Sequence, residues 1–181
     1  MARKESISKA GILDVAFAMI KTEGAASVTA RRLAVKANCS TQPIFRIFKS
    51  MEEMEQELFL KAIGYFEEFY LAFSKKSEMP FVNLGMAYIQ FALENKNIFA
   101  MLFTSKKRHG KTLYDLINGE SGAVGKEISK AKAAGCKDPG DLFMKIWMVI
   151  HGSACMSLTG DYDLGEAETQ KLLEDSYKAF I

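Results

Sequence analysis

Hydrophobic residues recur at helical spacing along almost the whole chain, and no segment of useful length alternates as a β-strand would. Ile12, Ala16 and Ile20 illustrate the pattern, because residues four apart lie on one face of a helix. The chain has 181 residues, of which 49% are hydrophobic, enough to form a core without disulfides. The sequence therefore predicts an all-α fold.

Capping residues, glycines and prolines divide the periodic pattern into about nine segments. The expected helices cover 6–23, 29–38, 40–48, 50–74, 81–95, 97–104, 111–134, 139–158 and 166–180. Residues 75–80 are expected to form a loop. Gly119, Gly122 and Gly125 weaken the helix at 111–134, which is therefore expected to be kinked or split.

The second and third predicted helices have the signals of a helix-turn-helix unit. Thr29 and Ser40 can cap the two helices, and Asn38 between them tolerates a left-handed backbone better than most residues. Pro43 would be the third residue of its helix, where its missing N–H costs no intrahelical bond. We therefore expect a three-helix head at residues 1–49 and a larger helical body at 50–181.

The charge is unevenly distributed between these two parts. Residues 1–50 hold nine Lys/Arg and three acids, a net charge of +6, whereas the other 131 residues have a net charge of −4. A basic segment on a mildly acidic body indicates a surface for a polyanion. The alternative at this point is an ordinary helical hairpin with a solvated basic face.

If the head reads DNA, its third helix enters the major groove with its first residues, Thr41, Gln42 and Pro43. Gln can contact adenine with two hydrogen bonds, and the Thr methyl can pack on a thymine methyl. Nearby cations could meet the phosphates on either side of that helix. They are Arg31, Arg32, Arg46 and Lys49.

Two stretches, residues 12–34 and 38–48, resemble the DNA-binding head of the tetracycline-repressor (TetR) family in both spacing and residue type. The resemblance implies a ligand-responsive transcription regulator, most simply a repressor that acts as a homodimer on a palindromic operator in double-stranded DNA. By the same resemblance, the positions that touch operator DNA are Thr29, Arg31, Thr41, Gln42, Phe45, Arg46 and Lys49. Separately, the three cysteines, Cys39, Cys136 and Cys155, are an odd number in a chain large enough to need none, which favours reduced thiols and a cytoplasmic location.

In this family the last two helices of each chain form the dimer, which implies a dimer surface at about 139–158 and 166–180. Met and aromatic side chains in the body suit apolar ligands, although an ordinary core would use the same residues. We expect a largely apolar effector that is neutral or weakly charged. The candidate lining residues are Phe66, Phe69, Tyr88, Phe91, Phe103, Trp147 and His151.

Other classes of function have little support. The longest uninterrupted apolar runs have about five or six residues, far short of the ~20 that a membrane span needs, and the first residues lack a secretory signal. His151 and Cys155 have the i, i+4 spacing of a ligand pair, but a zinc site needs at least three protein ligands. We therefore expect no metal, no cofactor and no catalytic residues.

Two alternatives to a regulator stay open. Phe45 stands where the family usually has Tyr, and Met51 where it often has Lys, and both changes remove expected phosphate contacts. A helical ligand-binding or carrier protein with a non-functional head would tolerate such changes. A helical enzyme is the second alternative, although the sequence has no catalytic constellation.

Overall fold

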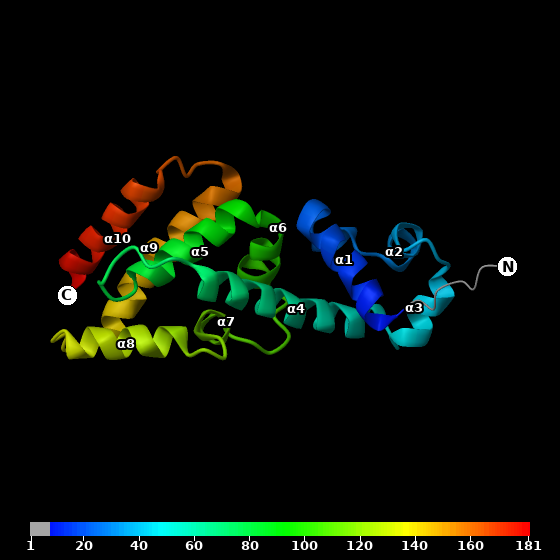
Figure 1. Ribbon diagram of the computed structural model, residues 1–181, viewed down its shortest axis with the longest axis horizontal. Helices are drawn as coiled ribbons and strands as arrows, with labels where there is room; N and C mark the ends of the chain where they lie inside the picture. Colours follow the sequence, from blue (N-terminus) through cyan, green and yellow to red (C-terminus); the bar gives the residue numbers. More distant parts are fainter. Residues whose placement is uncertain (1–7) are drawn as a thin grey trace. The chain divides into compact units, whose positions relative to one another are not determined.

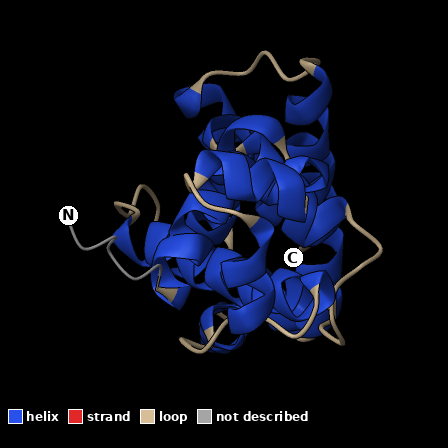
Figure 2. Ribbon diagram, turned by 90° about the vertical axis from the view of Figure 1, so that its right-hand side faces the viewer, coloured by secondary structure: helices blue, strands red, loops and turns tan. Residues whose placement is uncertain are grey.

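The computed structural model describes residues 8–181, and every regular element in these residues is helical (Figure 2). The predicted all-α fold is confirmed. Two short turns of other helical types, η1 (Ala25–Ser27) and η2 (Ala100–Thr104), accompany the α-helices. The α-helices are α1 (Lys9–Glu23), α2 (Ala30–Lys36), α3 (Thr41–Ile47), α4 (Met51–Ala72), α5 (Val82–Glu94), α6 (Lys96–Phe99), α7 (Leu113–Asn118), α8 (Ala123–Ala133), α9 (Pro139–Thr159) and α10 (Glu166–Phe180).

The helices pack into two compact units. The first unit comprises the residues up to Gly64 together with Asn97–Gly110, and the second comprises Tyr65–Lys96 together with Lys111–Ile181. The long helix α4 (Figure 1) therefore contributes residues to both units. The predicted boundary after residue 49 divides the chain by function rather than by packing, and it stays a prediction.

The core of the first unit contains the predicted stripe of α1. Ile12, Ala16 and Ile20 are buried, and Leu33 of α2 and Ile44 of α3 are buried as well. The Ser8 hydroxyl caps α1 by accepting the Gly11 N–H at 3.0 Å. The predicted helix start at residue 6 lies outside the described residues.

The helix α4 starts where the sequence predicts. The Ser50 hydroxyl accepts the Glu53 N–H at 3.1 Å, and the Glu53 carboxylate accepts the Lys49 N–H at 2.6 Å. These reciprocal bonds satisfy two of the N–H groups that a helix start leaves without partners. Two ion pairs then connect α4 to α1 within the first unit, Lys9–Glu57 at 2.5 Å and Lys61–Asp14 at 3.0 Å.

The second unit is built on close packing of α5, α9 and α10. Gly85 of α5 makes this approach possible, because a Cβ at this position would lie 2.8 Å from both Ile150 Cγ1 and Leu173 Cδ1. The predicted break of the 111–134 helix is also confirmed. Gly119 and Gly122 have φ of +56° and +65°, and they separate α7 from α8.

The segment predicted as a helix at 97–104 differs from a regular α-helix. It begins with α6 and continues as η2, a π-helical turn. The Ser105 N–H donates to the Ala100 carbonyl, five residues earlier, at 3.0 Å. A π turn widens the backbone by one residue, and apolar periodicity alone does not distinguish it from an α-helix.

Among the described residues, α9 is long and apolar enough to cross a membrane by length and composition, with a mean hydropathy of 1.3. The lack of a long uninterrupted apolar run does not exclude such a helix, because an 18-residue stretch of α9 is apolar on average. A helix in the core of a soluble protein passes the same test. The packing of α9 against α5, α8 and α10 is that of a core helix.

Candidate nucleic-acid interface

The helices α2 and α3 form the predicted helix-turn-helix unit. The Thr29 hydroxyl accepts the Arg32 N–H at 3.3 Å and caps α2. Asn38 has the expected left-handed backbone, with φ of +49°. In the same turn the Cys39 N–H donates to the Ala34 carbonyl at 2.9 Å, which closes the end of α2.

The helix α3 begins after Ser40, and Pro43 is its third residue, as predicted. Ser40 occupies the cap position, but its side chain makes no capping hydrogen bond, so only the position was predicted correctly. Ile44 is fully buried and anchors α3 in the head. Thr41 and Gln42 at the start of the helix are exposed. The arrangement presents the first turn of α3 to a ligand outside the protein.

The cations expected at DNA phosphates fall into two groups. Arg31, Arg46 and Lys49 are exposed, and within residues 8–181 no ion pair holds their side chains. Arg32 instead forms an ion pair and hydrogen bond with Glu23. This hydrogen bond, more than the Coulomb attraction, lowers the pKa of the Glu23 carboxyl below 4.5. Arg32 is therefore partly neutralised by an acid of the same head.

The remaining predicted DNA residues are also at the surface. Phe45 is 50% exposed, unusual for a large aromatic side chain in the middle of a short helix. Thr29 is exposed, and its hydroxyl is engaged in the cap of α2, while Pro43 is half-buried. All eight DNA contacts stay predictions.

Six of the seven predicted effector residues come together in the second unit. Phe66 packs edge-on against Phe91 with ring centroids 5.0 Å apart, and Tyr88 packs edge-on against Trp147 at 4.8 Å. Phe69 and His151 complete the cluster by contacts with Phe91 and Trp147. We refer to these six residues, Phe66, Phe69, Tyr88, Phe91, Trp147 and His151, as the aromatic cluster.

Phe103 does not belong to the aromatic cluster. It is buried in the first unit, where its ring lies 5.0 Å from that of Phe99. The sequence pattern selected it because aromatic residues at helical spacing look alike in every unit of a helical protein. The cluster itself consists of rings packed on one another, so it has the character of a closed core as much as that of a ligand site.

His151 and Cys155 do lie together, as their spacing on α9 predicts. His151 Nε2 is 3.6 Å from Cys155 Sγ, and burial raises the pKa of this thiol. In the part of the chain that the structure describes, no group of three or more His, Cys, Asp or Glu could hold a metal ion.

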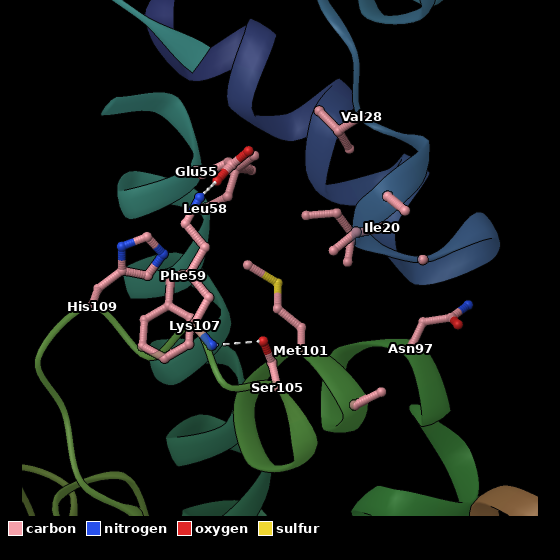
Figure 3. Close-up of a pocket in the computed structure, with 14 residues that line it drawn as sticks. Ile20, Val28, Glu55, Leu58, Phe59, Asn97, Met101, Ser105, Lys107 and His109 are labelled. Carbon is pink, nitrogen blue, oxygen red and sulfur yellow. Dashed lines mark hydrogen bonds and ion pairs between the residues drawn. The ribbon is translucent and has the colours of Figure 1, made fainter. Parts of the chain in front are cut away.

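Sequence reasoning missed a cavity of about 420 Å³ in the first unit. Its walls come from the end of α1, from η1, from α4 and from the α6–η2 segment (Figure 3). Ile20, Leu58 and Met101 supply apolar surface, and Lys107 and His109 come from the loop after η2. No local sequence signal marks such a cavity, because its walls are far apart along the chain.

The fold and the exposed α3 define a helical protein with a helix-turn-helix head of the DNA-binding type. The sequence model described as "Bacterial regulatory proteins, tetR family" matches residues 12–58. A second model, "Tetracyclin repressor-like, C-terminal domain", matches residues 81–180, more than half of the chain. The chain belongs to the TetR family and is a transcriptional regulator.

Two solved structures are similar over nearly the whole chain. A TetR-family protein from Vibrio parahaemolyticus is 18% identical, with a TM-score of 0.68, over 96% of this chain and 98% of its own. A TetR-family protein from a Rhodococcus species is 14% identical, with a TM-score of 0.61, over 93% and 96%. At these identities the likeness concerns the fold. No curated protein matches the sequence.

Family membership confirms three predictions made from the sequence. The head is a TetR-type DNA-binding domain, the chain is a regulator of transcription, and TetR-family regulators are DNA-binding proteins rather than enzymes. A carrier with a non-functional head would bind a ligand without binding DNA.

Proposed function

We propose that the protein is a homodimeric repressor that a small, largely apolar effector releases from a palindromic operator. The observation that carries this proposal is the exposed start of α3. Thr41 and Gln42 project from the head, Arg46 lies about one turn farther along α3, and Lys49 follows the end of the helix. A base-reading tip flanked by cations is what a recognition helix needs in the major groove. Its target is the genome, so the proposed location is the cytoplasm.

A dimer is proposed because one recognition helix reads too few base pairs for a specific site, and two-fold symmetry matches a palindrome. The surface of α9 supports it. Met144, Met148 and Met156 are 51%, 64% and 48% exposed and lie along one side of the helix. Gly152 lies on the same side, with open space where a Cβ would stand. A second copy of α9 and α10 would cover this apolar stripe.

The aromatic cluster is the proposed effector site of the second unit. Its rings now contact one another, so an effector would have to separate them and select a less populated conformation. The mechanism follows from linkage. An effector that binds the conformation with lower operator affinity shifts the population toward it, by no more than its differential affinity for the two states.

The experiment that tests the proposal is selection of genomic DNA fragments with the purified full-length protein. We expect recovery of sites with two-fold symmetry, bound by fluorescence anisotropy with a steep dependence on salt. Enrichment of no sequence, with only weak binding to any duplex, would contradict the proposal. That result together with tight binding of an apolar ligand would instead indicate a carrier.

A further inference from the structure

The cavity of the first unit is a preformed site next to the DNA-binding helices. It has a volume of about 420 Å³, within the range of roughly 300–1,000 Å³ that is usual for small-molecule sites. The Met101 side chain points into its middle, toward Ile20 and Leu58 (Figure 3). All the residues that line it belong to the first unit.

Two backbone irregularities form the wall of this cavity opposite α1 and η1. The π turn η2 contributes Ala100 and Met101, and such turns occur frequently at functional sites. His109 has a left-handed backbone with φ of +47°, and its ring lies 5.1 Å from that of Phe59 on α4. A non-glycine residue in this conformation is strained and is often found at ligand sites. Two unusual backbone conformations in the wall of one cavity favour a binding site over a packing defect.

The polar groups of the cavity define the chemistry of its ligand. Glu55 and Lys107 form an ion pair, and the hydrogen bond from the Lys107 ammonium to the Glu55 carboxylate is the main cause of the raised pKa of Lys107. A charged ligand end would have to compete with this pair. Ser105 and Asn97 add a hydroxyl and an amide, and both already bond within the protein: the Ser105 hydroxyl accepts the Lys107 N–H at 3.0 Å, and the Asn97 amide donates to the Lys21 carbonyl at 2.9 Å. A neutral molecule with an apolar body and one hydrogen-bonding group matches this lining without breaking the ion pair.

We infer that this cavity binds a neutral, largely apolar molecule with a single hydrogen-bonding group, and that its occupancy weakens operator binding. The second half of the inference rests on the proposed function. Ile20 and Val28, from α1 and from the end of η1, form the wall on the side of the head. Met101 and Ser105 form the opposite wall. A ligand between the two walls would contact α1, which packs against α2 of the helix-turn-helix unit.

The first test is NMR of the full-length protein with ¹³C-labelled methionine methyl groups, titrated with 1-octanol, octanoate and octylammonium. The three probes share one tail and differ in the charge of the head group. We expect 1-octanol to shift the Met101 methyl resonance to saturation, and to bind at least tenfold more tightly than either ion. The Met144 and Met148 methyls on α9 serve as internal controls. An unmoved Met101 resonance, or tighter binding of an ion, would overturn the inference.

Two variants test the location. Met101→Trp fills the cavity and should abolish saturable binding of 1-octanol, whereas Met79→Trp, the same change at a half-buried methionine of the second unit, should leave it intact. Ala100→Leu is a smaller filling change that should weaken binding at least fivefold, in case the larger residue disturbs folding. Binding that survives in both cavity variants would exclude this site.

The second test measures operator affinity by anisotropy with and without 1-octanol. We expect a loss of at least fivefold in the wild type and in Met79→Trp, and none in Met101→Trp. In the wild-type sample Trp147, the only tryptophan of that chain, reports on the aromatic cluster. If the Met101 shift saturates while operator affinity stays unchanged, the inferred coupling between the cavity and DNA binding is wrong. If no operator exists, the proposed function fails, while the NMR titration still decides whether the site exists.

Discussion

The phenol oxygen of Tyr88 lies 3.0 Å from Nδ1 of His151 and connects α5 with α9 across the aromatic cluster. Tyr88 is fully buried, and its ring also packs on that of Trp147. A buried hydroxyl needs a hydrogen-bond partner, because leaving it without one costs about 1–3 kcal/mol. The contact orients His151 in the wall of the cluster.

Tyr88→Phe removes this hydrogen bond while it keeps the ring and its packing. We expect a loss of about 1 kcal/mol in the free energy of unfolding, measured by urea denaturation. Phe66→Tyr, which adds a hydroxyl elsewhere in the cluster, is the comparison that separates loss of the bond from a general sensitivity of the core. An unfolding midpoint equal to that of the wild type would show that the bond contributes nothing net to stability.

The base-reading and phosphate roles of α3 can be separated by two substitutions. Gln42→Ala should relax the preference at one operator position, at a cost of about 1–3 kcal/mol for the preferred base. Arg46→Ala should weaken binding to every sequence and lower the slope of log K against log salt by about 1. Lys132→Ala on α8 is the control for a lost surface cation. A uniform loss of affinity in Gln42→Ala, with base preference intact, would contradict the assignment.

Glu23 limits the positive charge of the head, because it pairs with both Arg32 and Lys36. Glu23→Gln should raise DNA affinity and steepen the salt slope by roughly one unit for each additional phosphate that the released cations neutralise. Asp14→Asn makes the same charge change on α1 at the partner of Lys61, and we expect a smaller effect there. Equal increases in affinity for the two variants would show that only net charge matters.

The ion pair between Glu23 and Arg32 makes the stability of the protein depend on pH, and the sign of this dependence is defined. Because the folded pKa of Glu23 is lower than 4.5, the Arg32 interaction stabilises the protein above pH 4.5. This contribution is lost as the pH falls through the lowered folded pKa. The free energies of unfolding of the wild type and of Glu23→Gln should therefore become more similar as the pH is lowered.

Local signals predicted the head well. The cap of α2, the left-handed Asn38 and the position of Pro43 each depend on a few neighbouring residues, and all are present. Other features depend on distant partners. The backbone of Phe81, with φ of +66°, is held by a hydrogen bond of 2.8 Å from its N–H to the buried Glu127 carboxylate, 46 residues later. No pattern within a helix predicts such a contact.

The candidate sites show the same division between features set by neighbouring residues and features set by distant ones. The DNA-reading tip is local, so its residues could be named from the sequence. The cavity of the first unit is lined by residues between Ile20 and His109 that come from segments far apart along the chain, and the π turn that contributes Met101 has the apolar periodicity of an α-helix. Arg32 was expected at phosphates, and only the folded head shows that it forms an ion pair with Glu23.

The proposed dimer surface can be tested with one charge. Met148→Glu places a carboxylate in the centre of the exposed stripe on α9, and we expect monomers in sedimentation velocity and at least tenfold weaker operator binding. Leu60→Glu is the control at an equally exposed apolar residue of α4. Deletion of residues 164–181 is a less specific test, because it also removes Leu173 and Tyr177 from the core of the second unit. A stable dimer of Met148→Glu would place the interface elsewhere.

Two glycines inside helices should respond oppositely to the same substitution. Gly64 lies in α4, is exposed, and has no atom within 4 Å of the place where a Cβ would stand. Gly64→Ala should therefore add about 0.5–1 kcal/mol of stability from the lower conformational entropy of the unfolded chain. Gly85→Ala has the same entropy term, but its Cβ would lie 2.8 Å from side-chain atoms of Ile150 and Leu173. Overpacking of this kind typically costs about 1–3 kcal/mol, so a net loss is expected. Urea denaturation of the two variants beside the wild type measures both signs, and a stabilised Gly85→Ala would show that α9 and α10 can move apart at little cost.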